Sequence, residues 1–381
     1  MKKIYWRPQR VSLRILVLVA LVSVLGLISV ESFRVRVRQS YYREKSQAAR
    51  LMRRAMEVVR EERARRRLAV DPISDPTESG LIGVLLSSVT TSPGYLSAKQ
   101  TSINPNYAAV VVHYLYLAGV GPGDVVAVGM SGSFPAINIA VMAAIETVGA
   151  TPIYVTSAGA SQWGANIEGF MWPDIETALL KRKVFSQGSI AFSRGGVEDR
   201  ALGLSRAGRN QIDAAIRRSG IPQIDVSTYE DSLKQRMRLF ETHAGEKPIK
   251  AYINVGGGTT SVGTRLGKRM FRSGLNRNPP QGTDLIDSIM TRLALSGVPI
   301  IHLSGINTIA ERFGLPIQPT TIRPVGEGKI FEREQYRTSL VVGLLVGIVA
   351  LMFAFVRLDW GYRIMSTARR ESSDMRPEQM V

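Results

Sequence analysis

The sequence contains no cysteine and only three histidines, and these shortages exclude several kinds of chemistry. Without cysteine, the 381-residue chain has no disulfide bond, no thiolate nucleophile, no iron–sulfur cluster and no cysteine-ligated zinc. His113, His243 and His302 are too few for a histidine-rich metal site, so we expect no bound metal. The sequence leaves the identity of any other cofactor unknown.

Charged residues make up 21% of the chain and hydrophobic residues 45%, which is an ordinary globular composition. This balance excludes a disordered chain and a transporter with many membrane spans. The net charge of +18 is concentrated, since residues 1–70 hold 18 Lys and Arg against 5 Asp and Glu, whereas residues 71–356 hold 26 against 22. Because a nucleic-acid-binding domain usually carries the basic excess itself, we expect no nucleic-acid partner.

Two long hydrophobic runs lie near the ends of the chain. Val11–Val30 has one charge, Arg14, and Ser339–Val356 has none, and both are long enough to span a bilayer core. A signal peptide is the alternative for the first run, but no small-residue cleavage site follows it. A buried core helix is the alternative for the second run, but arginines flank it on both sides. We therefore predict two transmembrane helices, with the lipid bilayer as a partner.

The two runs divide the chain into a short basic tail (1–10), a transmembrane helix (11–30), a basic helical stalk (31–70), an α/β domain (71–338), a second transmembrane helix (339–356) and a polar tail (357–381). Two spans place both termini on one side of the cytoplasmic (inner) membrane. Short tails follow the positive-inside rule more closely than large domains do, so we predict cytoplasmic termini and an extracytoplasmic domain. The stalk is interpreted as a solvated helix or, alternatively, as a polycation that faces anionic lipid or polymer.

The middle region alternates between strands and helices. Asp124–Gly129 has the pattern of a buried strand, Pro135–Gly149 that of a helix with proline at its start and glycine at its end, and Thr151–Thr156 that of the next strand. Ala251–Val255 and Gly297–Gly305 echo the two strands, which favours two pseudo-repeated halves. This alternation predicts an α/β fold whose mostly parallel sheet has helices on both faces.

Loops rich in glycine, serine and threonine follow these strands, and in open α/β sheets the carboxyl ends of the strands face the ligand crevice. We therefore predict a polar ligand-binding cleft. Lys99 is included as the one basic residue of an uncharged stretch, and Trp163 because a large aromatic among small residues either caps the core or forms a wall of a crevice. The predicted ligand-binding residues are Lys99, Gly129, Gly132, Ser133, Ser157, Ser161, Trp163, Asn166, Gly256, Gly257, Gly258, Thr259, Thr260, Ser304 and Asn307.

The segment GMSGS, residues 129–133, is placed like a nucleophile elbow between a strand and a helix, although Ser133 replaces the last glycine of G-x-S-x-G. A serine hydrolase also needs a histidine, and His302 lies at another strand end. Ser131 and His302 are therefore the candidate catalytic residues. The stretch GDVVAVGMSGSFPAINIA also resembles the phosphosugar-binding loop of sugar-isomerase (SIS) domains, in which serine hydroxyls and helix-start amides hold a phosphate.

Nucleotide binding is not expected from the glycine-rich motifs. The segment GTTSVG, residues 258–263, is followed by Thr-Arg rather than Lys-Ser/Thr, so it does not form a P-loop. The alternatives for this loop are a tight strand-to-helix turn and an anion site on its backbone amides.

Four stretches, KQTSINPNYAA, GDVVAVGMSGSFPAINIAVMAAIE, TSAGASQWGAN and INVGGGTTSVG, resemble the poly-gamma-glutamate system protein family, as do the terminal hydrophobic runs. The resemblance implies a bacterial cell-envelope or capsule component of poly-γ-glutamate synthesis or export, with synthase subunits and the anionic polymer as partners. It implies no reaction and no catalytic residue. On this basis the α/β domain binds or processes the polymer or a precursor. The alternatives are a serine-dependent hydrolase or transferase, and a noncatalytic scaffold for the synthase complex.

Overall fold

The computed structural model describes residues 13–263 and 265–357, which divide into two compact units. The larger unit runs from Gln39 to Phe331. The described residues up to Arg38 and from Glu332 onward form the smaller unit. The predicted basic tail and the polar tail beyond Arg357 lie outside the described residues.

A seven-stranded sheet forms the centre of the larger unit, with the strand order β11-β12-β10-β3-β4-β8-β9. Its strands are β3 (Val125–Ser131), β4 (Thr151–Ser157), β8 (Ala191–Ser193), β9 (Gln223–Ile224), β10 (Ile249–Val255), β11 (Gly274–Asn276) and β12 (Ile300–Leu303). All neighbouring strands are parallel except β11 and β12, which are antiparallel. The predicted α/β fold with a mostly parallel sheet is confirmed.

Helices and short strands surround this sheet. The helices are α2 (Tyr42–Arg65), α3 (Leu96–Ser102), α4 (Tyr107–Leu117), α5 (Pro135–Val148), α6 (Trp172–Lys181), α7 (Arg206–Ser219), α8 (Tyr229–Ala244), α9 (Thr259–Val262), α10 (Arg265–Met270), the 3-10 helix η1 (Thr283–Leu285), α11 (Ile289–Leu295) and α12 (Ile306–Phe313). Two further pairs of short strands are β2 (Thr90–Ser92) with β5 (Ala160–Ser161) and β6 (Asn166–Ile167) with β7 (Phe170–Met171). The predicted punctuation of α5 is confirmed, since Pro135 begins it and Gly149 caps it in the left-handed conformation.

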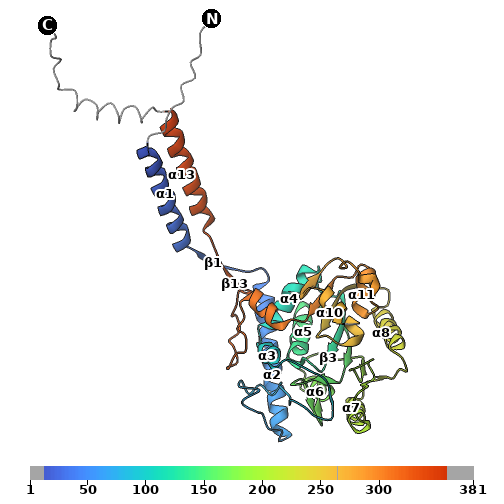
Figure 1. Ribbon diagram of the computed structural model, residues 1–381. Helices are drawn as coiled ribbons and strands as arrows, with labels where there is room; N and C mark the ends of the chain where they lie inside the picture. The colour runs from blue at the N-terminus through green and yellow to red at the C-terminus, as the bar shows by residue number, and fades with distance from the viewer. Residues whose placement is uncertain (1–12, 264, 358–381) are drawn as a thin grey trace, which may run out of the picture. The chain divides into compact units, whose positions relative to one another are not determined.

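Alternate residues of the central strands enter two different hydrophobic cores, because side chains alternate between the two faces of a sheet. On β3, Val126 and Val128 join a core with α2, α4 and α5, whereas Val125 and Ala127 join a second core with α8 and α11. Figure 1 shows these two sets of helices on opposite sides of β3. Both faces of the sheet are therefore covered, which explains why apolar residues on the central strands point to both sides, as Val125–Val128 do on β3.

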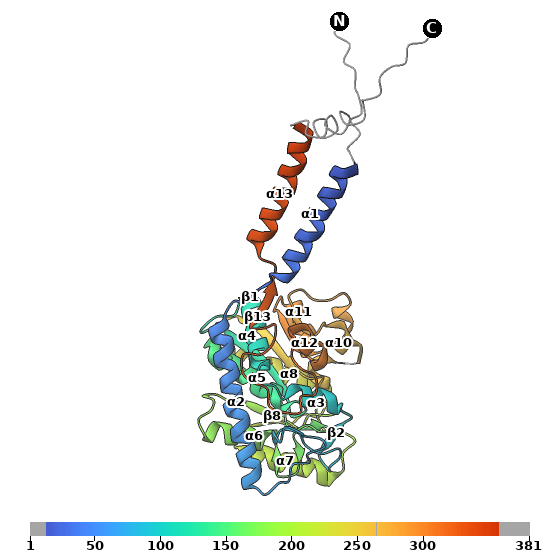
Figure 2. The same ribbon diagram turned by 90° about the vertical axis from the view of Figure 1, so that its left-hand side faces the viewer.

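Helix α2 corrects the predicted domain boundary. Its side chains Ala48, Met52 and Val59 are fully buried, and the helix packs against α4 and α5 along one side of the unit (Figure 2). The interpretation of residues 31–70 as a solvated stalk is therefore wrong for α2, Tyr42–Arg65. The α/β unit begins at residue 39 instead of 71 and ends at 331 instead of 338. Many basic residues lie on the outer face of α2, so the apolar residues that join the core are hard to recognise in the sequence.

The smaller unit consists of α1 (Leu13–Ser32), β1 (Val35–Arg38), β13 (Glu332–Gln335) and α13 (Thr338–Arg357). Strands β1 and β13 pair antiparallel, and the two helices touch, since a Cβ added to Gly26 would lie 2.4 Å from the side chain of Leu344. Large apolar side chains of both helices are exposed, among them Leu27 at 66% and Phe353 at 61%. Among the described residues, no helix is both long enough and apolar enough to cross a membrane. The predicted span Val11–Val30 begins before those residues.

Candidate functional site

The sheet has a topological switch point between β3 and β10. From β3 the chain continues through β4 and β8 to β9 at one edge, and it then returns to β10 on the other side of β3 and proceeds to β12. In open α/β sheets, ligands bind outside the carboxyl ends of the strands at the point where the strand order reverses. The loops after β3, β4, β8 and β10 all begin at this end of the sheet, so the fold itself indicates where a site should lie.

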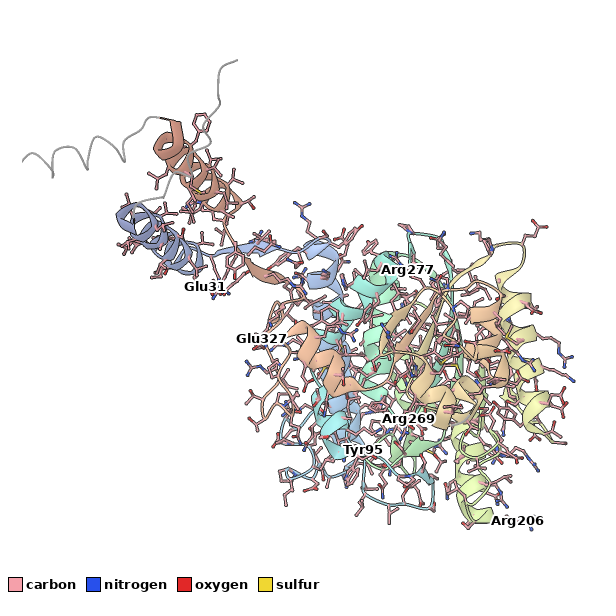
Figure 3. All side chains as sticks on the ribbon, turned by 45° about the horizontal axis from the view of Figure 1, so that its top comes forward. Glu31, Tyr95, Arg206, Arg269, Arg277 and Glu327 are labelled. Carbon is pink, nitrogen blue, oxygen red and sulfur yellow. The ribbon has the colours of Figure 1, made fainter. Side chains whose placement is uncertain are left out.

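A cleft of about 380 Å³ lies at this switch point. Its polar lining residues are Thr91, Ser92, Tyr95, Lys99, Ser131, Ser133, Ser157, Ser161, Asp199, Thr259, Thr260 and Lys268. Gly257 and Gly258 also line it. Tyr95 is 81% exposed and projects at the surface of the unit (Figure 3). The structure thus brings together most of the predicted serine, threonine and glycine residues around the one predicted lysine.

Lys99 is almost completely buried in the wall of the cleft, at 3% exposure. Its Nζ donates hydrogen bonds to the backbone oxygen of Ser133 and to Ser161 Oγ, the latter at 2.9 Å, and it lies 3.6 Å from the centre of the Phe134 ring. Burial, with a smaller contribution from the ammonium group of Lys268, lowers the pKa of Lys99 to about 7. The amine is therefore a mixture of charged and neutral forms near pH 7, a state in which it can take up or release a proton.

The turn between β3 and α5 holds the groups that contact Lys99. The backbone N–H of Ser133 donates to Ser131 Oγ at 3.2 Å, and Ser133 Oγ accepts a hydrogen bond from the backbone N–H of Ser161 at 3.0 Å. Pro135 then begins α5. These hydrogen bonds join the loop after β3 to the loop after β4, and Lys99 reaches both loops from α3.

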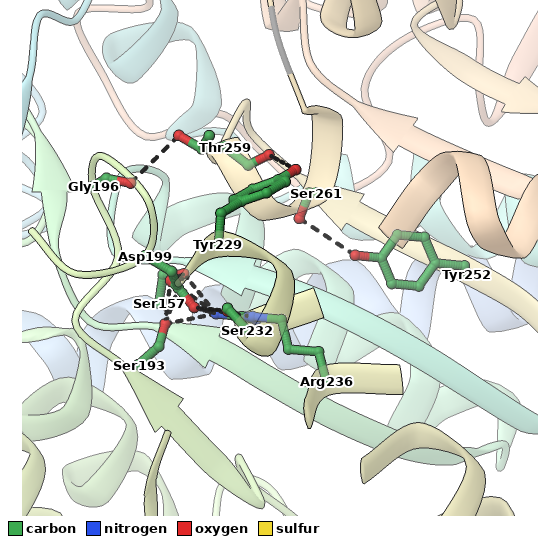
Figure 4. Close-up of polar contacts among 10 residues, drawn as sticks. All are labelled: Ser157, Ser193, Gly196, Asp199, Tyr229, Ser232, Arg236, Tyr252, Thr259 and Ser261. Atoms are coloured by element: carbon green, nitrogen blue, oxygen red, sulfur yellow. Dashed lines mark hydrogen bonds and ion pairs between the residues drawn. The ribbon is translucent and has the colours of Figure 1, made fainter. Parts of the chain in front are cut away.

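A buried ion pair joins Asp199, which lines the cleft, to Arg236 (Figure 4). The pair is 2.9 Å long and its side chains are 1% and 3% exposed. The carboxylate also accepts hydrogen bonds from Ser193 Oγ and Ser232 Oγ, both at 2.6 Å, and the guanidinium donates to Ser157 Oγ at 3.2 Å. The two charges neutralise each other, so this cluster adds no net charge to the cleft. It fixes Ser157 and the loop after β8.

The glycine-rich loop after β10 forms the opposite wall. Thr259 Oγ1 donates to the backbone oxygen of Gly196 at 3.4 Å, which links this loop to the loop after β8 (Figure 4). Gly256 has a φ of +84°, a conformation that other residues rarely adopt. A Cβ added to Gly257 would lie 3.0 Å from Cε of Lys268, so glycine leaves room for that lysine over the loop.

The predicted catalytic partner His302 does not line the cleft, and its ring bonds to residues other than Ser131. Asn254 Nδ2 donates to its Nδ1 at 2.9 Å, which leaves the proton on Nε2, and Nε2 donates to Ser304 Oγ at 2.6 Å. Burial, together with the charge of Lys268, lowers the pKa of His302 to about 4, so the ring is neutral at pH 7. The structure places Ser131 and His302 in separate hydrogen-bond networks, and the role of each stays a prediction.

Several predicted ligand-binding residues lie outside the lining of the cleft, namely Gly129, Gly132, Trp163, Asn166, Gly256, Ser304 and Asn307. Close packing explains the first two, because a Cβ on Gly129 would lie 2.2 Å from the hydroxyl of Tyr252 and one on Gly132 would lie 2.6 Å from the backbone oxygen of Ala158. Both glycines therefore allow the loops to pack tightly.

The side chains of the remaining residues in this group have local surroundings of their own. Asn166 accepts from the backbone N–H of Val84 at 2.9 Å and donates to its oxygen at 2.7 Å, and Trp163 packs against the larger core. Ser304 bonds to His302, whereas Asn307 Oδ1 is buried without a hydrogen-bond partner among the described residues.

The sequence patterns do not predict three segments that line the cleft. Residues 91–95 comprise the end of the short strand β2 and the loop before α3, and Lys268 is one of several basic residues around α10. The third segment, Gly195–Asp199, follows β8 and begins with two glycines, so it shares the glycine content of the predicted loops. That signal is present in the sequence, but a strand of three residues gives too short a pattern to recognise.

The chemistry of the cleft follows from its lining. In residues 13–263 and 265–357, no group of three or more His, Asp and Glu side chains could hold a metal ion. The cleft presents hydroxyl groups, glycine-rich backbone and two lysines, while the one carboxylate among its described lining residues is neutralised by Arg236. Such a lining is complementary to an anionic ligand that also forms hydrogen bonds.

Comparison of the chain with protein-family models, with curated proteins and with solved structures gave no match. The resemblance to the poly-gamma-glutamate system protein family, and that of the loop after β3 to SIS domains, therefore remain predictions from the sequence.

Proposed function

We propose that this protein is a membrane-anchored component of poly-γ-glutamate synthesis or export, and that its α/β unit binds the polymer or a γ-glutamyl precursor in the cleft. The observation that carries the proposal is the presence of Lys99 and Lys268 in a cleft where Asp199, the one carboxylate among the described lining residues, is already paired with Arg236. Neither lysine forms a salt bridge with any described residue. Each γ-glutamyl unit carries one α-carboxylate, which would supply the missing partner.

The position of each lysine suggests a different role in binding. Lys268 is exposed beside the glycine-rich loop, so its ammonium can meet a carboxylate that enters from solvent. Lys99 is buried and already contacts Ser133 and Ser161, so it faces the part of the ligand that lies deepest. A γ-glutamyl unit offers both a carboxylate and an uncharged amide, and we propose that Lys268 meets the first and Lys99 the second.

We further propose that the hydrophobic runs 11–30 and 339–356 anchor the protein in the cytoplasmic membrane. The proposal is supported by the paired helices α1 and α13, which expose many large apolar side chains. Both sequence runs extend beyond the side chains that the structure describes. The positive-inside rule favours cytoplasmic termini, so that the α/β unit meets the polymer outside the membrane.

Binding of short γ-glutamyl oligomers to the full-length protein tests the proposal, and isothermal titration calorimetry measures it. We expect Lys268→Met to weaken binding by about 10- to 100-fold, because a hydrogen bond to a charged group contributes about 1.5–3 kcal/mol. Lys250→Met is the matched control, since Lys250 is exposed at the amino end of β10, away from the cleft. An oligomer whose α-carboxylates are converted to amides should bind weakly to every variant. Equal affinity for the acidic and the amidated oligomer would contradict the proposal.

The cellular role and the membrane anchoring need separate tests. Deletion of the gene should change the yield, length or surface retention of the polymer, and unchanged values of all three would rule out the proposed role. A reporter fused to the C-terminus should be active only on the cytoplasmic side. Activity outside the membrane would reverse the proposed orientation.

A further inference from the structure

We propose that Ser161 and Lys99 form a catalytic dyad for acyl transfer, with Ser161 Oγ as the nucleophile and Lys99 Nζ as its base. The dyad differs from the Ser131–His302 pair that the sequence suggests. The inference rests on the proposed function only in its choice of substrate class, the γ-glutamyl amides. The dyad itself is argued from contacts within the cleft.

The contact between the two groups has the geometry that proton transfer requires. Lys99 Nζ and Ser161 Oγ are 2.9 Å apart, and both residues line the cleft. A general base must lie within hydrogen-bond distance of the proton that it removes, about 2.6–3.2 Å between heavy atoms. The short strand β5, which follows the carboxyl end of β4 in the chain, thus presents a hydroxyl group to an amine in the cleft wall.

Ser161 is distinguished from the other serines of the cleft by what its hydroxyl contacts. Ser131 Oγ and Ser133 Oγ each accept a hydrogen bond from a backbone N–H, and Ser157 Oγ is part of the Asp199–Arg236 cluster. The hydroxyl of Ser161 instead bonds to the amine of Lys99. Unlike these three serines, Ser161 presents its hydroxyl to a lysine amine.

Lys99 can act as a base because its surroundings favour the neutral amine. Burial lowers its pKa to about 7, so roughly half of the molecules carry a lone pair on Nζ at that pH. One N–H of the neutral amine can donate to the backbone oxygen of Ser133, which leaves the lone pair to accept the proton of Ser161. The Phe134 ring, 3.6 Å from Nζ, stabilises the cation that forms.

The backbone around Ser161 holds a side chain that is only 6% exposed but lines the cleft. Strand β5 pairs with β2, and the N–H of Gln162 donates to the backbone oxygen of Ser92 at 3.0 Å. Gly94 packs closely on this segment, since an added Cβ would lie 2.6 Å from the backbone oxygen of Gln162 and 3.2 Å from Ser161 Oγ, so a larger residue here would crowd the hydroxyl. The nucleophile is therefore held in place, and a substrate would reach it through the cleft.

The proposed reaction proceeds in two balanced steps. Ser161 Oγ attacks the carbonyl carbon of an amide and forms a C–O bond, while its proton passes to Lys99 Nζ. The C–N bond then breaks, and Lys99 returns the proton to the departing amine nitrogen. In the second step, water or another amine attacks the ester carbonyl, Lys99 takes its proton, and Ser161 Oγ leaves and recovers a proton from Lys99.

The absence of natural cysteine permits a direct test of the contact. The variant Ser161→Cys contains the single thiol of the chain, and its alkylation by iodoacetamide is measured against pH in the full-length protein. We expect the thiol to titrate at least about one unit below its usual pKa of about 8.5, because the Lys99 ammonium stabilises the thiolate. Adding Lys99→Met should abolish this shift. The control Ser131→Cys should respond little to Lys99→Met. If the thiol of Ser161→Cys titrates identically with and without Lys99, the dyad is overturned.

The second test measures the serine itself. A fluorophosphonate probe should form an adduct with Ser161, located by mass spectrometry. Lys99→Met and Lys99→Arg should each slow the labelling by about 100-fold, since general bases contribute about 10²- to 10⁴-fold. Ser186→Ala, at an exposed serine that bonds to Glu146 and does not line the cleft, should leave the labelling rate unchanged. An adduct on another serine, or labelling independent of Lys99, would contradict the inference.

The two proposals fail separately. If γ-glutamyl oligomers bind but Ser161 does not react and the thiol of Ser161→Cys has an ordinary pKa, the dyad is wrong and the binding function stands. If Ser161 is labelled but the oligomers do not bind, the dyad stands and the substrate class is wrong.

Discussion

Two polar clusters flank the same cleft and differ in how their charges are balanced. In the cluster around Asp199 and Arg236, both charges are paired and the surrounding serine hydroxyls bond to them. In the cluster around Lys99, the amine contacts a backbone oxygen, a hydroxyl group and an aromatic ring, and no carboxylate of the described residues neutralises it. The first cluster is complete without a ligand, whereas the second is not.

This difference separates a structural role from a functional one. A buried ion pair with all its hydrogen bonds formed fixes the loops that carry it, and removing one partner leaves a buried charge without compensation. A buried lysine without a counter-ion costs stability in the folded protein, and such perturbed groups are concentrated at functional sites. Substitutions in the two clusters, made in full-length protein in detergent micelles, should therefore have different consequences.

The largest effect is expected from Arg236→Met. This substitution leaves Asp199 buried and unpaired, so the free energy of unfolding should fall by about 3–5 kcal/mol. Urea denaturation followed by tryptophan fluorescence measures this loss. The double variant Asp199→Asn with Arg236→Met removes both charges and should recover part of the stability. A loss below about 1 kcal/mol for the single variant would show that the cluster is not structural.

The second prediction concerns the pH dependence of stability set by Lys99. Its pKa is about 7 in the folded protein and about 10.5 in the unfolded chain. Between these values the unfolded chain binds a proton that the folded protein lacks, so the free energy of unfolding should rise with pH by up to about 4 kcal/mol. Lys99→Met should remove this rise when the two proteins are compared between pH 7 and pH 10. If the free energy of unfolding changes with pH in the same way in both proteins, Lys99 stays charged in the folded protein.

A third prediction concerns His302, whose pKa of about 4 in the folded protein lies below the usual 6.5. The unfolded chain therefore takes up a proton first as the pH falls, and the protein should lose about 3 kcal/mol of stability between pH 6.5 and pH 4. The variant His302→Gln should show a smaller acid dependence than the wild type. The same slope in both proteins would assign the acid sensitivity to other groups.

The smallest expected effect is a difference in the free energy of unfolding between two serine variants. Ser193 Oγ bridges Asp199 and Arg236, so Ser193→Ala should cost about 1–2 kcal/mol by leaving these buried groups with one partner fewer. Ser161→Ala removes one partner of Lys99, but the amine keeps its bond to the backbone oxygen of Ser133, so the expected loss is smaller, below about 1 kcal/mol. Denaturation curves of the two variants compare them directly. Equal losses would contradict the division into a structural and a functional cluster.

The sequence predicts the sheet well because the signals are local. Val125–Ser131, Thr151–Ser157 and Ile249–Val255 are apolar runs followed by small-residue loops, and Pro135 and Gly149 mark the ends of a helix. Helix α2 is harder to place, since its apolar side chains Met52 and Val59 lie among many arginines. Their helical spacing indicates a buried face, but it does not predict against which part of the protein this face packs.

The site is only partly visible in the sequence, because contacts between distant segments create it. Lys99 and Ser161 are 62 residues apart, and only the packing of α3 against the loops after β3 and β4 brings them together. The partnership of Asp199 with Arg236 likewise spans 37 residues and has no local pattern. For His302 the sequence suggests more than the structure shows. Its position at a strand end suggests a catalytic role, but the side chain is buried and bonds to Asn254 and Ser304.

The central claim is that Lys99 is a partly neutral amine beside Ser161 within the cleft. Carbon-13 labelling of the lysine side chains, followed by NMR titration of the full-length protein, measures its protonation directly, and the Lys99→Met variant assigns the resonance. The structure leads us to expect a midpoint near pH 7 for Lys99. A midpoint near the usual value of about 10.5 would contradict both the claim and the dyad that depends on it.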